Sequence, residues 1–227
     1  MTPLEIEALS LSLKVALWSV LGVLLPGTAL AWLLARRNFP GKAVLDALVH
    51  LPLVVPPVVV GYLLLVLLGR RGPLGAALYD LFGVTLVFSW QGAAIAAGVM
   101  ALPLYVRAVR LSFESVDERL ETAARTLGAG RLRVFATVTL PLIVPGLLTG
   151  VVLAFARALG EFGATITFVS NIPGQTRTLP LAIYSALQSP DGEAAALRLT
   201  ILSVILAFAA IAASELIARR YGRALES

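Results

Sequence analysis

The chain has 227 residues, of which 59% are hydrophobic and only 14% are charged. Soluble domains carry roughly 25% charged residues, so this composition indicates a membrane protein. The sequence has no Cys and a single His, His50. This excludes disulfides and Cys catalysis, and it argues against a zinc site or a bis-His haem. We therefore expect no metal and no cofactor on this chain.

The net charge of +5 could indicate binding to nucleic acid. However, the basic residues lie between apolar runs and leave no continuous basic face for a duplex. We interpret them as signals of membrane topology and expect no nucleic-acid partner.

Apolar runs predict the architecture. A membrane-spanning helix needs roughly 20 mostly apolar residues, and five segments qualify. They are residues 11–35, 43–69, 84–106, 134–156 and 194–218. Glu5 and Glu7 precede the first run without any basic residue, so we expect an uncleaved first span and no signal peptide. The fold class is thus an all-α integral membrane protein, with residues 1–227 forming a single transmembrane domain in contact with lipid.

The distribution of Lys and Arg predicts the orientation. With the N-terminus outside, twelve of the 18 basic residues lie on the inner side and six on the outer side. Cytoplasmic loops are enriched in Lys and Arg, so we predict N-out and C-in. Arg70 and Arg71 are the discordant pair. Prolines within several spans predict bent helices, which are typical of transporters.

Residues 160–193 form a less apolar stretch that we expect to be an external or re-entrant loop. Arg157 and Glu161 are four residues apart and can pair on a helix. They form a candidate gate or guide for an anion, or a structural ion pair at a helix end. Thr165, Ser170 and Asn171 could donate hydrogen bonds to an oxyanion, or could satisfy turn backbone.

Asp46 and His50 are also four residues apart, and we expect them to form a structural pair near the inner end of the second span.

The predicted cytoplasmic segment 113–133 contains a short amphipathic helix. Ser115 followed by Glu118 fits a capping box that starts a helix, and Gly128 fits its end. Small and apolar residues share one face of this helix: Leu120, Ala123, Ala124 and Leu127. The helix either rests on lipid or docks into a groove of a protein partner, and the pattern alone favours neither.

A family resemblance bears on this choice. Ala123-Ala124, three further residues, Gly128, then nine residues and Val138-Thr-Leu140-Pro141 resemble the EAA signature of ABC importer permeases. The resemblance implies that the segment is a coupling helix seated in a cleft of a cytoplasmic ATPase subunit. One departure concerns Glu121, which lies one residue before the position that the signature gives to Glu and that Thr122 occupies here.

The resemblance extends over most of the chain. Five blocks are similar to the molybdate permeases of ABC importers, namely residues 39–42, 51–62, 123–130, 156–165 and 168–174. It implies a type I importer of the inner membrane, in which two copies of this chain form the pore. Two ATPase subunits would bind ATP and Mg²⁺, since this chain lacks a Walker motif, and a periplasmic oxyanion-binding protein would deliver molybdate or tungstate.

Two alternatives remain open. One is a permease for another oxyanion such as sulfate, and a second is a stand-alone secondary transporter, although paired repeats are not evident. An intramembrane enzyme is disfavoured, because the sequence has neither a Gly-x-Ser-x-Gly elbow nor a His-Glu-x-x-His site.

Overall fold

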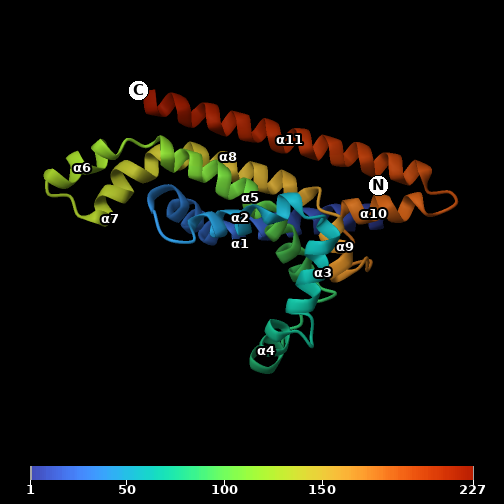
Figure 1. The fold of residues 1–227 in the computed structure, drawn as a ribbon. Coiled ribbons are helices and arrows are strands. Elements are labelled where there is room, and N and C mark those ends of the chain that lie inside the picture. Colours follow the sequence, from blue (N-terminus) through green and yellow to red (C-terminus); the bar gives the residue numbers. More distant parts are fainter. Residues whose placement is uncertain (1, 227) are drawn as a thin grey trace.

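The computed structural model describes the backbone of residues 2–226 and the side chains of residues 2–212. Within this range every regular element is helical, and the long helices form an elongated bundle (Figure 1). Four are long and apolar enough to cross a membrane, and a bent helix pair makes a fifth. The single long helices are α1 (Pro3–Arg36), α5 (Trp90–Ser115), α8 (Leu140–Leu159) with its preceding turns, and α11 (Glu193–Glu226). The prediction of about five spans is confirmed.

Helix α5 lies at the centre of the bundle and packs against α1 and α8. Its small residues Ala93, Ala96, Ala97 and Ala101 are fully buried. Small side chains let membrane helices approach closely, because the attraction there is mainly van der Waals contact. The ring of Tyr105 fills the space beside Gly27 of α1 and Gly150 of α8, and its hydroxyl pairs with that of Thr28 at 2.8 Å.

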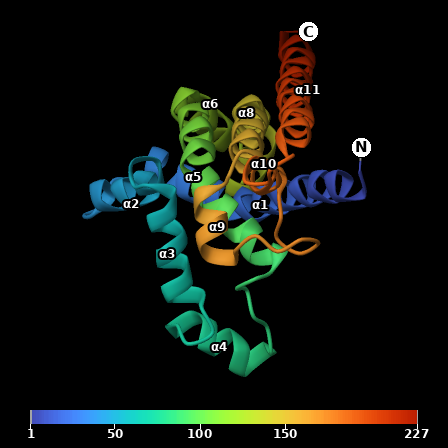
Figure 2. The ribbon, with the colours of Figure 1, turned by 90° about the vertical axis from the view of Figure 1, so that its right-hand side faces the viewer.

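The expected second span at 43–69 is not one straight helix. It consists of α2 (Lys42–Val54) and α3 (Pro57–Leu68), which meet at an angle of 116°. Pro56 and Pro57 both lack an N–H group, and a residue before proline avoids the helical region. Accordingly Val55 and Pro56 are extended, with ψ of 137° and 135°. Figure 2 shows α3 leaving the bundle, with α4 (Pro73–Phe82) beyond it.

The other elements lie at the two ends of the bundle. Short helices α6 (Glu118–Thr126) and α7 (Arg131–Val134) lie at one end, near the C-terminus. Helix α10 (Leu179–Leu187) lies at the other end, near the N-terminus (Figure 1). The termini at opposite ends agree with an odd number of crossings. The side chains of Arg219, Arg220 and Arg223, which contribute to the predicted orientation, lie outside the described residues.

Several span boundaries differ from expectation. Helix α1 begins at Pro3 rather than at residue 11, and α5 ends at Ser115 rather than at residue 106. Helix α5 begins at Trp90 rather than at residue 84, because Ser89 caps it by accepting a hydrogen bond from the Gly92 N–H at 3.1 Å. The fourth span begins at Arg131, passes through a π-helical turn, η1 (Phe135–Thr139), and continues as α8. Leu140 and Pro141 therefore lie inside this helix, at the change from π to α geometry.

Candidate functional site

The helix expected in segment 113–133 is α6, but its start differs from the expected capping box. Ser115 is the last residue of α5, and its hydroxyl donates to the Ser112 carbonyl at 2.8 Å. Asp117 is the residue that caps α6, since its carboxylate accepts the Arg119 N–H at 2.9 Å. An acidic cap is favourable at the positive end of the helix dipole. After the helix, Gly128 adopts φ +86°, which favours glycine.

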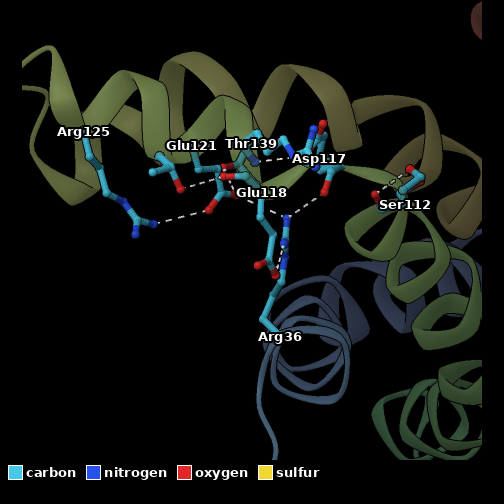
Figure 3. A network of polar contacts seen from close by, with 11 residues as sticks. Arg36, Ser112, Asp117, Glu118, Glu121, Arg125 and Thr139 are labelled. Carbon is cyan, nitrogen blue, oxygen red and sulfur yellow. Dashed lines mark hydrogen bonds and ion pairs between the residues drawn. The ribbon is translucent and has the colours of Figure 1, made fainter.

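Glu121 connects α6 to the rest of the molecule (Figure 3). One carboxylate oxygen accepts hydrogen bonds from the Thr139 hydroxyl at 2.8 Å and from the Arg36 guanidinium at 3.3 Å. The other oxygen accepts from Arg125 at 3.3 Å. Arg36 also binds Glu118 at 2.8 Å. The carboxylate of Glu121 thus joins α6 to the end of α1 and to η1.

The two glutamates of α6 differ in their exposure to solvent. The side chain of Glu118 is 79% exposed, whereas that of Glu121 is 16% exposed and that of Arg36 is 13% exposed. Exposed ion pairs contribute little to stability because water competes for both charges. The pair of Arg36 with Glu121 is therefore the stronger attachment of α6.

The opposite face of α6 is exposed in the described chain. None of its residues is buried, and Leu127 just beyond its end is 89% exposed. Leu120 and Ala123 are also exposed, and Ala124 is half-buried. Large exposed apolar side chains outside a membrane indicate an interaction surface. We call Leu120, Ala123 and Leu127 the outer face of α6.

Val138 lies within the π-helical turn η1, and Leu140 and Pro141 follow it directly. The Leu140 N–H donates to the Phe135 carbonyl, five residues back, as a π-helix requires. Pro141 cannot donate, so regular α-helical bonding cannot extend through this point. Isolated π turns are frequent at functional sites, and this one presents the Thr139 hydroxyl to Glu121.

The structure brings Arg157 and Glu161 together at the end of α8. The guanidinium lies 2.6 Å from the carboxylate, and the Glu161 side chain is 1% exposed. Its second oxygen accepts the Ala164 N–H at 2.8 Å, at the start of α9 (Gly163–Val169). The pair therefore ties α8 to α9. Its predicted role as a gate stays a prediction.

The other predicted path residues lie in α9 and the loop after it. Thr165 is buried within α9. Asn171 donates to the Ser185 hydroxyl at 2.7 Å and accepts from Arg177 at 2.9 Å. Ser170 adopts φ +65°, and its carbonyl accepts from Thr176 at 3.1 Å. Asn171 and Ser170 thus order the loop, and their contact with an anion stays a prediction.

Asp46 and His50 form the expected pair at 3.2 Å. Asp46 also accepts from Arg110 of α5 at 3.0 Å, and Arg110 binds Glu114 at 2.7 Å. This network holds α2 against α5. Among the described residues, no three His, Cys, Asp or Glu side chains gather as a metal site.

The sequence did not single out Arg36 and Thr139 as partners of Glu121. Arg36 with Arg37 was interpreted as a topology signal at the end of the first span. Its contact with Glu121 joins residues 85 apart, so no local spacing could indicate it. The only local signal for Thr139 is its place between Val138 and Leu140 of the motif.

Comparisons with known proteins connect this arrangement to transport. Residues 27–223 match the family described as binding-protein-dependent transport system inner membrane component. The chain is 62% identical over 219 residues to the molybdenum transport system permease protein ModB of Escherichia coli (strain K12), covering 96% of each chain. It is 54% identical over 222 residues to ModB of Haemophilus influenzae, covering 98% of this chain and 97% of that protein.

A solved structure confirms the fold. The chain superposes with a TM-score of 0.75 and 18% identity on a chain of a bacterial alginate ABC transporter, solved in complex with an alginate pentasaccharide-bound periplasmic protein. The match covers 97% of this chain and 80% of that chain. The fold is that of a type I ABC importer permease.

Proposed function

The chain belongs to the family of binding-protein-dependent transport system inner membrane components, and on this premise we propose that it carries molybdate across the inner membrane as the permease subunit of an ATP-driven importer. We infer the substrate from the 62% identity to a molybdenum permease over nearly the whole chain. Its relatives are transport permeases and not enzymes, so ATP hydrolysis belongs to a separate subunit.

The outer face of α6 is the proposed docking site for that ATPase subunit. It presents exposed leucines and a small side chain, Ala123, outside the apolar spans. The opposite face is held to the bundle through Glu121. A partner that binds the outer face can therefore move α6 as a unit. Ala124 and Gly128 shape the same surface, and two copies of each subunit would complete the transporter.

The contacts of Glu121 support a route for the motion. A displacement of α6 acts on α1 through Arg36, at the inner end of that span. It acts on α8 through Thr139, which lies in the π-helical turn that leads into α8. Both spans pack against α5, so the two contacts bias the packing of the central helix. Such coupling fits alternating access by rocking of packed helices.

At the other end of the bundle, the loop around Asn171 and Arg177 is the proposed contact for a periplasmic binding protein. The two side chains are fixed to each other and to Ser185 of α10. A loop ordered in this way presents a constant shape to a partner. The gate proposed at Arg157 and Glu161 lies beneath it, where α8 meets α9.

The substrate is tested by ATP hydrolysis in liposomes that contain this chain, its ATPase subunit and the cognate binding protein. We expect stimulation when the binding protein is loaded with molybdate or tungstate, and none with sulfate. Stimulation by sulfate alone would keep the importer and overturn the substrate. If no ATPase subunit copurifies with the chain, the importer proposal fails and a stand-alone transporter replaces it.

The docking site is tested separately with Leu127→Asp. We expect this variant to fold normally and to lose copurification with the ATPase subunit, because a charge replaces an 89% exposed apolar contact. Leu187→Asp is the matched control, since Leu187 is also exposed but lies at the other end of the bundle. If Leu127→Asp still copurifies with the ATPase subunit as the unchanged chain does, α6 is not part of the interface.

A further inference from the structure

A second feature lies on the inner side of α6. A cleft of about 820 Å³ opens between the end of α1 and the segment from α6 to η1. Its walls combine apolar side chains with polar and charged ones. We call it the inner cleft, and its principal apolar residues are Leu25, Trp32, Phe113, Val134 and Phe135. Phe113 and Val134 are buried, whereas Leu25, Trp32 and Phe135 are exposed. Exposed apolar side chains grouped in a cleft indicate a site for an apolar partner.

The rim of the inner cleft is basic. Arg36 and Arg125 line it but are paired with carboxylates of α6. Arg37 and Arg131 also line it, and neither has a carboxylate within 4.0 Å among the described side chains. The guanidinium of Arg37 lies 5.4 Å from the ring centre of Trp32. Two uncompensated cations therefore lie beside an apolar wall.

The dimensions of the cleft match one leaflet of a membrane. Along α1 it extends from Leu25 to Arg37, which at 1.5 Å per residue is about 18 Å. Half of a hydrocarbon core is about 15 Å. An acyl chain beside Leu25 and a head group at Arg37 would thus span the length of the cleft. The predicted orientation places this end on the cytoplasmic side.

We propose that the inner cleft binds an anionic phospholipid of the cytoplasmic leaflet, with its phosphate between Arg37 and Arg131. Basic pockets between spans on this side suit anionic head groups. The ATPase is a poorer occupant, since it is proposed to bind the outer face of α6, and the residues of that face do not line the cleft. A free anion would satisfy the two cations but leave the apolar wall in water.

Lipid in this position would affect the coupling helix. Arg37 follows Arg36 directly, and Arg131 begins the helix that contains Thr139. A phosphate bound by both arginines therefore bridges the same two segments that Glu121 joins. The consequence rests on the proposed role of α6, but lipid binding itself does not.

Trp32 provides a direct probe of the inner cleft. The chain has three Trp residues, so Trp18→Phe with Trp90→Phe leaves Trp32 alone in the full-length protein. We expect brominated phosphatidylglycerol to quench its fluorescence at a roughly tenfold lower mole fraction than brominated phosphatidylcholine, given two arginines near the head group. Arg37→Gln with Arg131→Gln should make the two lipids equal within about twofold.

Two controls isolate the site. Arg133→Gln removes a neighbouring exposed charge that does not line the cleft and should keep the preference. Inorganic phosphate added alone should not relieve the quenching. Equal quenching by both lipids, a preference that survives the double substitution, or displacement by phosphate would each overturn the proposal. If neither lipid quenches Trp32, the cleft is covered by protein, either a second copy or the ATPase, and the proposal fails.

Discussion

Removing the carboxylate of Glu121 should release α6 from the bundle. In Glu121→Ala, the Thr139 hydroxyl loses its acceptor. Because Thr139 is only 4% exposed, water has little access to replace that acceptor. Arg36 retains the pair with Glu118 and a hydrogen bond of 3.4 Å to the Val116 carbonyl. Because α6 buries no residue of its own, no apolar packing replaces these contacts.

The size of the effect follows from these contacts. An unsatisfied buried hydroxyl costs about 1–3 kcal/mol, and a hydrogen bond to a charged group contributes about 1.5–3 kcal/mol. With Arg36 partly retained, we expect a loss of about 2 kcal/mol for docked α6. At 1.36 kcal/mol per tenfold change, the undocked population rises about 30-fold.

Hydrogen exchange of the α6 backbone measures this population, because amides of a locally opened element exchange in proportion to opening. We expect exchange in residues 118–126 to accelerate about 30-fold in Glu121→Ala. Glu118→Ala is the matched control. It removes a partner of the same Arg36, but this partner is 79% exposed, so less than about 1 kcal/mol and a fivefold change should follow. Equal acceleration in the two variants would refute the assignment of Glu121 as the main attachment.

Two further substitutions test the packing around α9. Gly61→Ala should lower the free energy of unfolding by about 1–3 kcal/mol, because its Cβ would lie 2.6 Å from the Ala164 carbonyl oxygen. Gly22→Ala is the control in thermal unfolding, since its Cβ would meet no atom within 4 Å. Glu161→Ala should cost about 3 kcal/mol or more, because Arg157 is left without its buried partner. A melting temperature for Glu161→Ala equal to that of the unchanged chain would show that the pair is not structural.

The spans were predictable because the thickness of a bilayer fixes a minimum apolar length. That rule depends only on the length and apolar composition of a segment, so it cannot distinguish a straight helix from a bent one. The run at 43–69 is apolar throughout, yet the chain turns at Pro56–Pro57. Pro52, by contrast, lies inside α2 without ending it. Two adjacent residues without N–H groups remove more backbone bonding than a single proline does.

The attachment of α6 was harder to predict. Glu121 is predicted as a coupling residue, although motif spacing places Thr122 at the position expected for Glu. In the structure the Thr122 hydroxyl donates to the Glu118 carbonyl of its own helix, at 3.0 Å. Glu121 faces the bundle instead and meets Arg36. Contacts between distant segments depend on helix packing, which a single sequence does not specify.

The way α6 is held bears on how it can work. A helix anchored by apolar burial would resist displacement along its whole face, whereas α6 buries none of its residues and is joined to the spans mainly through Glu121. Elements that move in coupled transitions come from the less stable parts of a fold. An attachment of a few polar contacts lets α6 shift as a unit while still acting on both α1 and α8. Replacing those contacts by apolar packing would therefore be expected to stabilise the permease and weaken its response to the ATPase.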